Sequence, residues 1–269
     1  MKKVRLDQLV YDRGLTESRE RAKTSIMAGM VFVNGQRASK PGTSIPENSS
    51  IELKGEAIPY VSRGGLKLEK ALKIFCLDVR NFICIDCGAS TGGFTDVLLK
   101  NGAKLVYAVD VGYGQLAWSL RTDERVVCME RTNIRFVTAD MLPQTPKLAV
   151  ADLSFISLKL VLPVIKKLLT KDAFVICLIK PQFEAGKDKV GKKGVVRDRQ
   201  THADVLNDFV DFAPSAGFSV LGLGYSPIKG PEGNIEYLAF LQNTVQGHSE
   251  IDVSAVVEAS HAELEKPIV

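Results

Sequence analysis

The sequence predicts an α/β protein with a mostly parallel seven-stranded sheet and an antiparallel last strand, preceded by a small α+β domain. From residue 82 onward, apolar strand-like runs alternate with amphipathic helical segments, which is typical of a parallel sheet buried on both faces. The last two strands are joined by a short proline- and glycine-rich segment. Because that segment is too short for a helical crossover, this pair should be antiparallel.

Each strand of the predicted sheet is a short apolar run, and most of the runs are separated by a helical pattern. The strands are expected at residues 82–86, 105–110, 126–129, 148–152, 174–180, 219–225 and 236–241. Helices are expected at residues 66–75, 93–101, 114–121, 158–169 and 202–216, where apolar residues recur at helical spacing. The carboxyl ends of the parallel strands then share one edge of the sheet, which is where such sheets bind ligands.

The N-terminal region follows a different order, with two short helices before a small antiparallel sheet. Ser18 is placed to cap the second helix, and Gly29 is placed to end it. Asn34 and Gly35 lie between two short apolar runs, and this pair is a strong hairpin signal. We therefore predict a separate small domain built from two helices and a hairpin.

The predicted boundaries divide the chain into residues 1–60 (small domain and linker), 61–245 (larger α/β domain) and 246–269 (a polar, alanine-rich tail). The first 60 residues hold ten Lys and Arg against seven Asp and Glu, which is most of the chain's net charge of +4. A basic module joined to a nearly neutral domain favours a polyanionic partner for the module.

Composition argues against several other classes of protein. No apolar run approaches the ~20 residues needed to cross a bilayer, and the N-terminus lacks a signal-peptide pattern. We therefore expect a cytoplasmic protein without a membrane partner. The five cysteines include the pair Cys84 and Cys87, which falls inside a predicted buried strand, so buried thiols are expected. No second ligand pair stands near them, so no metal site is predicted.

A glycine-rich turn follows the first strand of the larger domain. Such a turn lets the backbone approach a ligand closely and begins a helix whose N-terminal amides face it. Asp110 ends the next strand and suits a ribose diol. These features fit a nicotinamide enzyme nearly as well as a methyltransferase, but the G-x-x-x-G-G spacing and the antiparallel pair favour the latter. The candidate cofactor residues are Asp86, Gly88, Ser90, Thr91, Gly92, Gly93, Phe94 and Asp110.

Four charged residues are predicted to meet at the same edge of the sheet. Asp152 and Lys180 end two parallel strands, Glu236 begins the antiparallel strand, and Lys67 lies in the helix before the first strand. Any one of them alone is most simply a solvated charge or half of a salt bridge. Four together, beside a cofactor crevice, favour catalysis. A ribose hydroxyl needs a base, and a lysine serves if burial and a neighbouring cation lower its pKa.

The motifs resemble those of a known family. Residues 2–60 look like an S4 RNA-binding domain, and residues 61–243 resemble the FtsJ-like methyltransferases, which have a Rossmann-like class I fold. The two together are similar to the TlyA (haemolysin A) family. Its signatures stand here at residues 62–68, 86–95, 110–116, 130–133, 151–157, 180–184 and 230–237.

The resemblance implies a function and its residues. The implied reaction transfers a methyl group from S-adenosyl-L-methionine to a ribose 2′-hydroxyl, that of cytidine in 16S or 23S ribosomal RNA within ribosomal subunits. It implies a catalytic tetrad formed by Lys67, Asp152, Lys180 and Glu236. It also adds Val111, and Asn133 near the adenine, to the cofactor site.

Contacts to RNA phosphates are expected in the small domain, where Arg5, Arg19, Arg21 and Lys23 are the candidates. A monomer is favoured. Three alternatives remain at this stage: a ribosome-assembly module that binds RNA with an inactive methyltransferase domain, a haemolysin with indirect lytic activity, and a nicotinamide oxidoreductase. Binding of S-adenosylmethionine or of a nicotinamide cofactor separates the last from the others.

Overall fold

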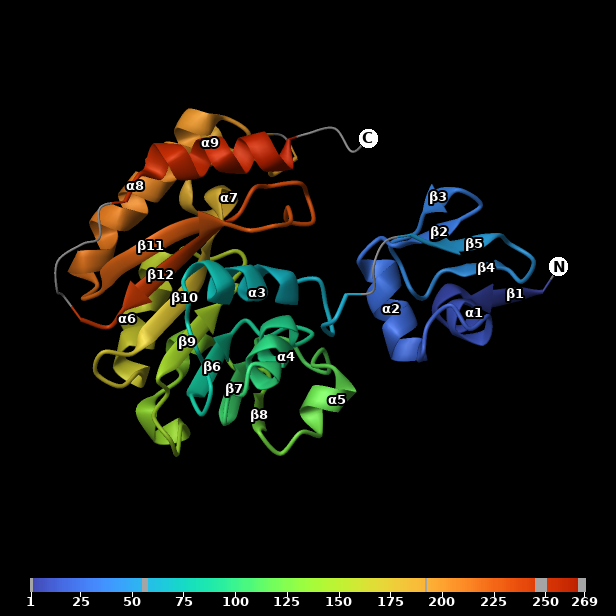
Figure 1. Ribbon diagram of the computed structural model, residues 1–269, viewed down its shortest axis with the longest axis horizontal. Helices are drawn as coiled ribbons and strands as arrows, with labels where there is room; N and C mark the ends of the chain where they lie inside the picture. The colour runs from blue at the N-terminus through green and yellow to red at the C-terminus, as the bar shows by residue number, and fades with distance from the viewer. Residues whose placement is uncertain (1, 55–57, 192, 245–250, 266–269) are drawn as a thin grey trace. The chain divides into compact units, whose positions relative to one another are not determined.

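The chain divides into two compact units, residues 1–63 and 64–269, each with its own core. The computed structural model (Figure 1) describes residues 2–54, 58–191, 193–244 and 251–265. The predicted linker near residues 55–60 and the predicted tail at residues 246–269 therefore lie partly outside the described residues.

The first unit combines two helices with two small antiparallel sheets. Its elements are β1 (Lys3–Arg5), α1 (Leu6–Asp12), α2 (Arg19–Met27), β2 (Val31–Val33), β3 (Gln36–Arg37), β4 (Ser44–Pro46) and β5 (Ile51–Leu53). Strand β1 pairs with β4, and the second sheet has the order β3-β2-β5. The predicted helix cap and turn residues are confirmed. Ser18 Oγ accepts a hydrogen bond from the Arg21 amide, and Gly29, Asn34 and Gly35 all have positive φ.

The second unit contains the predicted sheet of seven strands, in the order β11-β12-β10-β9-β6-β7-β8. The strands are β6 (Ile83–Cys87), β7 (Leu105–Val109), β8 (Val126–Met129), β9 (Leu148–Ala151), β10 (Phe174–Ile179), β11 (Ser219–Tyr225) and β12 (Tyr237–Gln242). Strand β12 is antiparallel to both of its neighbours, whereas the pairs among β6 to β10 are parallel. The mostly parallel sheet and its antiparallel last strand are thus confirmed.

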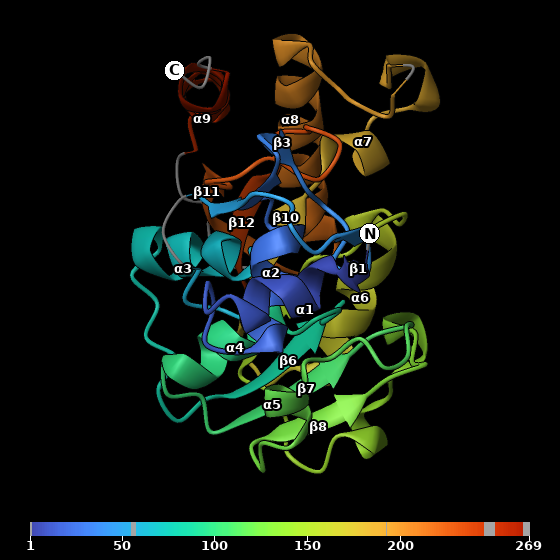
Figure 2. The ribbon, with the colours of Figure 1, turned by 90° about the vertical axis from the view of Figure 1, so that its right-hand side faces the viewer.

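Helices cover both faces of this sheet, as its continuous apolar strands require. They are α3 (Gly65–Ile74), α4 (Gly93–Lys100), α5 (Trp118–Arg121), α6 (Leu158–Leu168), α7 (Pro181–Glu184), α8 (Arg199–Ser215) and α9 (Val253–Leu264), with 3₁₀ turns at Ile134–Phe136, Ala139–Met141 and Lys187–Lys189. Figure 2 shows α3 and α4 on one side of the sheet and α6 on the other. Helices α6 and α8 pack into one large core with inward residues of the strands, and on the opposite face Phe75 stacks on Phe240 of β12.

Two local features complete the second unit. Helix α9, in the segment that the sequence sets apart as a tail, contributes Val253 and Val257 to the core of this unit. The thiols of Cys84 and Cys87 are free and buried, as predicted. Among the described residues, no helix combines the length and apolar character that crossing a bilayer requires.

Candidate active site

The four predicted catalytic residues lie at one edge of the sheet because of strand direction. Asp152 directly follows β9 and Lys180 directly follows β10, so both stand at carboxyl ends. Glu236 precedes β12, which runs the opposite way, so its start lies at the same edge. Lys67 reaches the group from the first turn of α3. The topology therefore assembles residues that are up to 169 positions apart in the sequence.

Asp152 is the centre of this group. Its Oδ1 lies 2.5 Å from Lys180 Nζ, and its Oδ2 lies 3.0 Å from Lys67 Nζ. Lys67 Nζ also lies 2.7 Å from Glu236 Oε2. The result is a continuous chain of alternating charge, Lys180–Asp152–Lys67–Glu236. We name these four residues the tetrad.

The ionisation of the tetrad is controlled by its mutual contacts. Burial disfavours the ammonium of Lys67, but the Asp152 and Glu236 carboxylates outweigh burial and raise the pKa of Lys67. Burial likewise favours the neutral acid at Asp152, but the two lysines outweigh it and lower the pKa of Asp152. Lys67 is therefore a fixed cation bound by two carboxylates, whereas Lys180 forms an ion pair with a single carboxylate among the described residues.

A pocket of about 770 Å³ opens beside the tetrad, and Asp152 is part of its wall. This volume is within the range of small-molecule sites, roughly 300–1,000 Å³. The pocket lies beyond the ends of β6, β7 and β9. Its lining includes five predicted cofactor residues, Gly88, Ser90, Asp110, Val111 and Asn133.

The turn after β6 needs glycine where it passes the tetrad. Gly88 has φ +88°, and a Cβ there would lie 2.8 Å from the carbonyl oxygen of Asp152. The next strand supplies Asp110, whose two carboxylate oxygens accept hydrogen bonds from the amides of Ser90 and Gly112, at 2.7 Å each. Asp110 thus fixes both loops that form this end of the pocket.

The other five predicted cofactor residues are not among those that line the pocket. Asp86 is fully buried, and its Oδ2 accepts hydrogen bonds from the Thr95 amide and hydroxyl at 3.0 and 2.7 Å. Burial raises the pKa of Asp86 to about 7, although the bonds from Thr95 oppose this shift. Gly92 has φ +94° and packs closely under Leu120. The remaining three, Thr91, Gly93 and Phe94, are part of the same turn and the start of α4.

The site also contains two residues, Ser154 and Phe155, that the sequence does not single out. Ser154 Oγ accepts a hydrogen bond from Lys180 Nζ at 3.1 Å and so is the second partner of that lysine. Phe155 lines the pocket, is 90% exposed and has φ +64°, an uncommon conformation for a bulky residue. Its ring centroid lies 5.1 Å from that of Phe183. Both residues belong to the segment 151–157, but nothing in their spacing shows which way the loop turns.

The predicted RNA-binding residues have different surroundings in the first unit. Arg5 and Arg19 both form ion pairs, at 3.0 Å, with the buried carboxylate of Asp7. Arg21 donates to the backbone carbonyl of Ile58 at 2.6 Å. Lys23 forms no hydrogen bond or ion pair within the described part of the chain. Arg5 and Arg19 remain about half exposed, so their outer faces are accessible to a phosphate.

Comparison with known proteins identifies the family. Residues 60–243 match the FtsJ-like methyltransferases and residues 4–51 match the S4 domain. The chain is 52% identical over 271 residues to Bacillus subtilis (strain 168) YqxC, provisionally named an rRNA methyltransferase, covering 98% of this chain and 96% of that protein. It is 45% identical over 242 residues to the Mycobacterium tuberculosis (strain ATCC 25618 / H37Rv) 16S/23S rRNA (cytidine-2′-O)-methyltransferase TlyA, with 90% of each chain covered.

A solved structure from Streptococcus thermophilus, provisionally named a hemolysin, superposes with a TM-score of 0.80 at 50% identity and covers 98% of both chains. Both the domain content and the fold expected from the sequence are therefore confirmed. The glycine-rich turn fitted both a nicotinamide enzyme and a methyltransferase, and the family match favours the methyltransferase. The chain belongs to the TlyA family, in which an S4 domain precedes an FtsJ-like methyltransferase domain.

Proposed function

We propose that this protein transfers the methyl group of S-adenosyl-L-methionine to the 2′-hydroxyl of a cytidine ribose in ribosomal RNA. The observation that carries the proposal is the position of Asp152. The Asp152 carboxylate binds two lysines of the tetrad, and Asp152 is also part of the pocket wall. A bound methyl donor and a group that activates the acceptor are thereby adjacent.

The pocket suits this cofactor in size and in its polar groups. Asp110 provides the carboxylate for a ribose diol. The turn at Gly88–Ser90 provides backbone close to the ligand. Asn133 Oδ1 accepts hydrogen bonds from the Arg135 amide and guanidinium at 3.0 and 3.3 Å, whereas its side-chain NH₂ has no partner among the described residues. When bound, S-adenosylmethionine supplies an electrophilic methyl group. The residues of the chain hold it at the sheet edge and keep the tetrad beside it.

The tetrad would act on the acceptor hydroxyl. A ribose hydroxyl is a weak nucleophile until its proton is accepted by a neighbouring group. Lys67 is held by two carboxylates, so Lys180 is the lysine left to contact the hydroxyl and, in its neutral form, to take the proton. Asp152 and Ser154 hold Lys180 in place at 2.5 and 3.1 Å. Lys67 helps to keep Asp152 ionised, and Glu236 holds Lys67 in place.

Two further observations support an RNA acceptor. The S4 domain is an RNA-binding module, and the first 60 residues carry most of the net positive charge of the chain. The exposed ring of Phe155, next to the tetrad, offers a stacking surface for an unpaired base. The choice of ribosomal RNA and of cytidine rests on the name of the Mycobacterium tuberculosis relative.

The decisive experiment measures methyl transfer from labelled S-adenosylmethionine to ribosomal subunits that lack the modification. We expect label on a ribose 2′-oxygen, detected as resistance of one linkage to alkaline hydrolysis. Lys180→Met should reduce the single-turnover rate by about a hundredfold or more, since acid–base catalysis typically contributes that much. Lys159→Met is the matched control and should retain the wild-type rate, because Lys159 pairs with Asp208 and neither residue is among those that line the pocket.

The alternatives give different results in the same assay. Cofactor binding without transfer to either subunit would support a role in ribosome assembly with an inactive catalytic domain. Transfer by Lys180→Met at the wild-type rate would remove Lys180 from the mechanism while leaving the methyltransferase intact. Label on a base rather than on a ribose would refute the proposed acceptor.

A further inference from the structure

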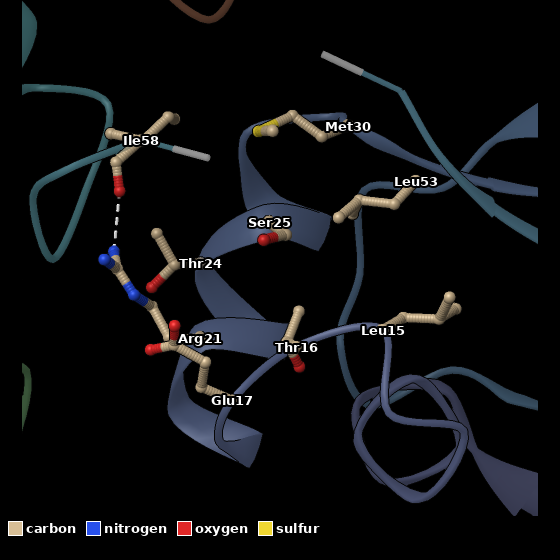
Figure 3. A pocket seen from close by; sticks show the side chains of 9 residues that line it. All are labelled: Leu15, Thr16, Glu17, Arg21, Thr24, Ser25, Met30, Leu53 and Ile58. Carbon is tan, nitrogen blue, oxygen red and sulfur yellow. Dashed lines mark hydrogen bonds between the residues drawn. The ribbon is translucent and has the colours of Figure 1, made fainter. Parts of the chain in front are cut away.

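The S4 unit contains a cavity that neither the fold family nor the tetrad explains. It has a volume of about 160 Å³ and lies within residues 1–63. Figure 3 shows α2 along its floor, with Arg21 and Thr24 on one side and Leu15 and Leu53 on the other. Its lining residues are Leu15, Thr16, Glu17, Arg21, Thr24, Ser25, Met30, Leu53 and Ile58. We name it the S4 cavity.

The S4 cavity has the size and walls of a site for one flat ring. Leu15, Met30, Leu53 and Ile58 supply apolar surface. An apolar cavity of roughly 150 Å³ holds a benzene molecule, so a volume of about 160 Å³ accommodates a pyrimidine base. The cavity is open to the surface, which lets a sugar and phosphate remain outside.

One wall of the S4 cavity is fixed by hydrogen bonds within the chain. Arg21 Nη1 donates to the carbonyl oxygens of Ile58 and Tyr60, at 2.6 and 3.3 Å. Thr24 Oγ1 lies 3.0 Å from the carbonyl oxygen of Val61. These bonds hold Ile58 against α2, as the dashed line in Figure 3 indicates for Arg21. The site is therefore formed before any ligand arrives, which reduces the entropy lost on binding.

Two polar groups of the lining have no partner in the described part of the chain. Neither the Glu17 carboxylate nor the Ser25 hydroxyl makes a hydrogen bond or an ion pair there. An exposed carboxylate repels phosphates, so Glu17 does not serve general RNA affinity. A carboxylate does accept hydrogen bonds from the exocyclic amino group of cytosine. Glu17 and Ser25 thus provide the polar contacts that a base edge requires beside apolar walls.

We infer that the S4 cavity binds one unstacked pyrimidine base of the RNA, with cytosine preferred because of its amino group. The inference rests on the proposed function, since it takes RNA as the substrate, but it concerns a site outside the methyltransferase unit. It gives the S4 domain a base contact in addition to its phosphate contacts. Single-stranded bases are commonly recognised in this way, between an apolar surface and groups that read the base edge.

Methionine-methyl NMR on the full chain tests the inference directly. The chain has five methionines; Met30 lines the S4 cavity, while Met27, the last residue of α2, is exposed and lies outside the lining. The probe is a nine-nucleotide single-stranded oligouridine RNA with one central cytosine. We expect it to shift the Met30 methyl signal and not that of Met27. The all-uridine RNA should shift Met30 less at equal concentration, and inorganic phosphate should leave it unmoved.

Two variants and one control connect the signal to binding. Ser25→Leu fills the cavity and should weaken binding of the cytosine-containing RNA about tenfold, the loss typical of one stacked base. Glu17→Gln changes only an exposed group and should remove the preference for cytosine over uridine. Glu20→Gln removes a similar charge from α2 outside the cavity and should preserve that preference.

The outcomes separate this inference from the proposed function. If RNA binds while Met30 and Met27 shift equally, or neither shifts, the base site is wrong. If Ser25→Leu weakens binding to whole subunits but not to naked RNA, and RNA leaves Met30 unmoved, the occupant is a ribosomal protein and the inference fails. A shift of Met30 together with absent methyl transfer would support the base site and contradict the proposed enzyme activity.

Discussion

At the scale of single residues, Asp152 shows how one charge organises the site. It is largely buried between two ammonium groups, and removing its charge would leave Lys67 with Glu236 alone and Lys180 with the Ser154 hydroxyl as its partner. Unpaired buried charges are strongly destabilising. The carboxylate therefore stabilises the tetrad as well as orienting Lys180, and both effects depend on its ionised form.

Asp152→Asn should accordingly lower both activity and stability. We expect single-turnover methyl transfer to fall by about a hundredfold or more, because Lys180 loses its anionic partner. The midpoint of urea unfolding should also decrease, since the two lysines remain buried. Asp208→Asn removes an exposed partner of Lys159 and should change neither quantity. Wild-type transfer by Asp152→Asn would show that the ion pairs are structural only.

Residues of the site differ in how well the sequence predicts them. The tetrad is predictable because strand ends must meet at one edge of a parallel sheet. Ser154 and Phe155 are not, because their roles depend on a positive φ at Phe155 that no spacing reveals. Arg21 was expected to contact phosphate, but its hydrogen bond to Ile58 depends on how the chain returns to α2. Contacts made by loops are set by tertiary structure.

At the scale of elements, a buried polar cluster joins α8, α9 and β12. His202 Nδ1 lies 2.9 Å from His261 Nε2 and 2.8 Å from Tyr237 Oη, and Tyr237 Oη lies 3.1 Å from Ser260 Oγ. His261 Nδ1 lies 3.1 Å from Glu265 Oε1. His202 and His261 are 59 positions apart in the sequence. Only the packing of α9 on α8 brings them together.

This cluster makes the stability of the second unit depend on pH. Burial, reinforced by His261, lowers the pKa of His202 to about 4 from its ordinary 6.5. Between pH 6.5 and 4 the unfolded chain therefore binds a proton at this residue that the folded chain does not. The free energy of unfolding should fall as the pH is lowered through this range, by up to about 1.4 kcal/mol per pH unit. Above pH 6.5 this residue contributes no pH dependence.

His202→Asn tests this prediction because it removes the titrating group and retains a polar side chain. Urea unfolding of both proteins should be measured at pH 7.0, 6.0 and 5.0. We expect the variant to be less stable at pH 7.0, with a difference that narrows as the pH falls. Carboxylates such as Asp152 titrate equally in both proteins, so their contribution cancels. If the free energies of unfolding of the two proteins changed equally with pH, His202 would not be the cause of the pH dependence.

At the scale of the whole molecule, the fold was the most predictable property. Apolar strands that alternate with helices permit few topologies, and the short connection before β12 requires its antiparallel direction. The pattern does not show that α9 packs on the second unit, because the alanine-rich composition of this helix does not indicate which surface it covers. The chain divides into two units because it forms two separate cores, and the sequence shows a distinct hydrophobic pattern for each core.

Because the two units have separate cores, we expect the S4 unit to set the affinity for RNA and the second unit to set the rate of methyl transfer. Lys23 lies in the S4 unit without a partner in the described chain, so Lys23→Gln should remove a phosphate contact and disturb little else. The affinity for ribosomal subunits should weaken, and the slope of log affinity against log salt should decrease by about one. The rate at saturating subunits should stay at the wild-type value, whereas Lys180→Met lowers that rate.

The matched control for this prediction is Lys104→Gln, which removes an exposed charge from the second unit and should leave both affinity and salt dependence unchanged. Filter binding at several salt concentrations and single-turnover transfer at saturation give the two quantities independently. A fall in the saturated rate for Lys23→Gln, with affinity intact, would mean that the S4 unit acts on the chemical step. Separate effects would instead show that RNA capture and methyl transfer are properties of different units, as their separate cores and unequal charge suggest.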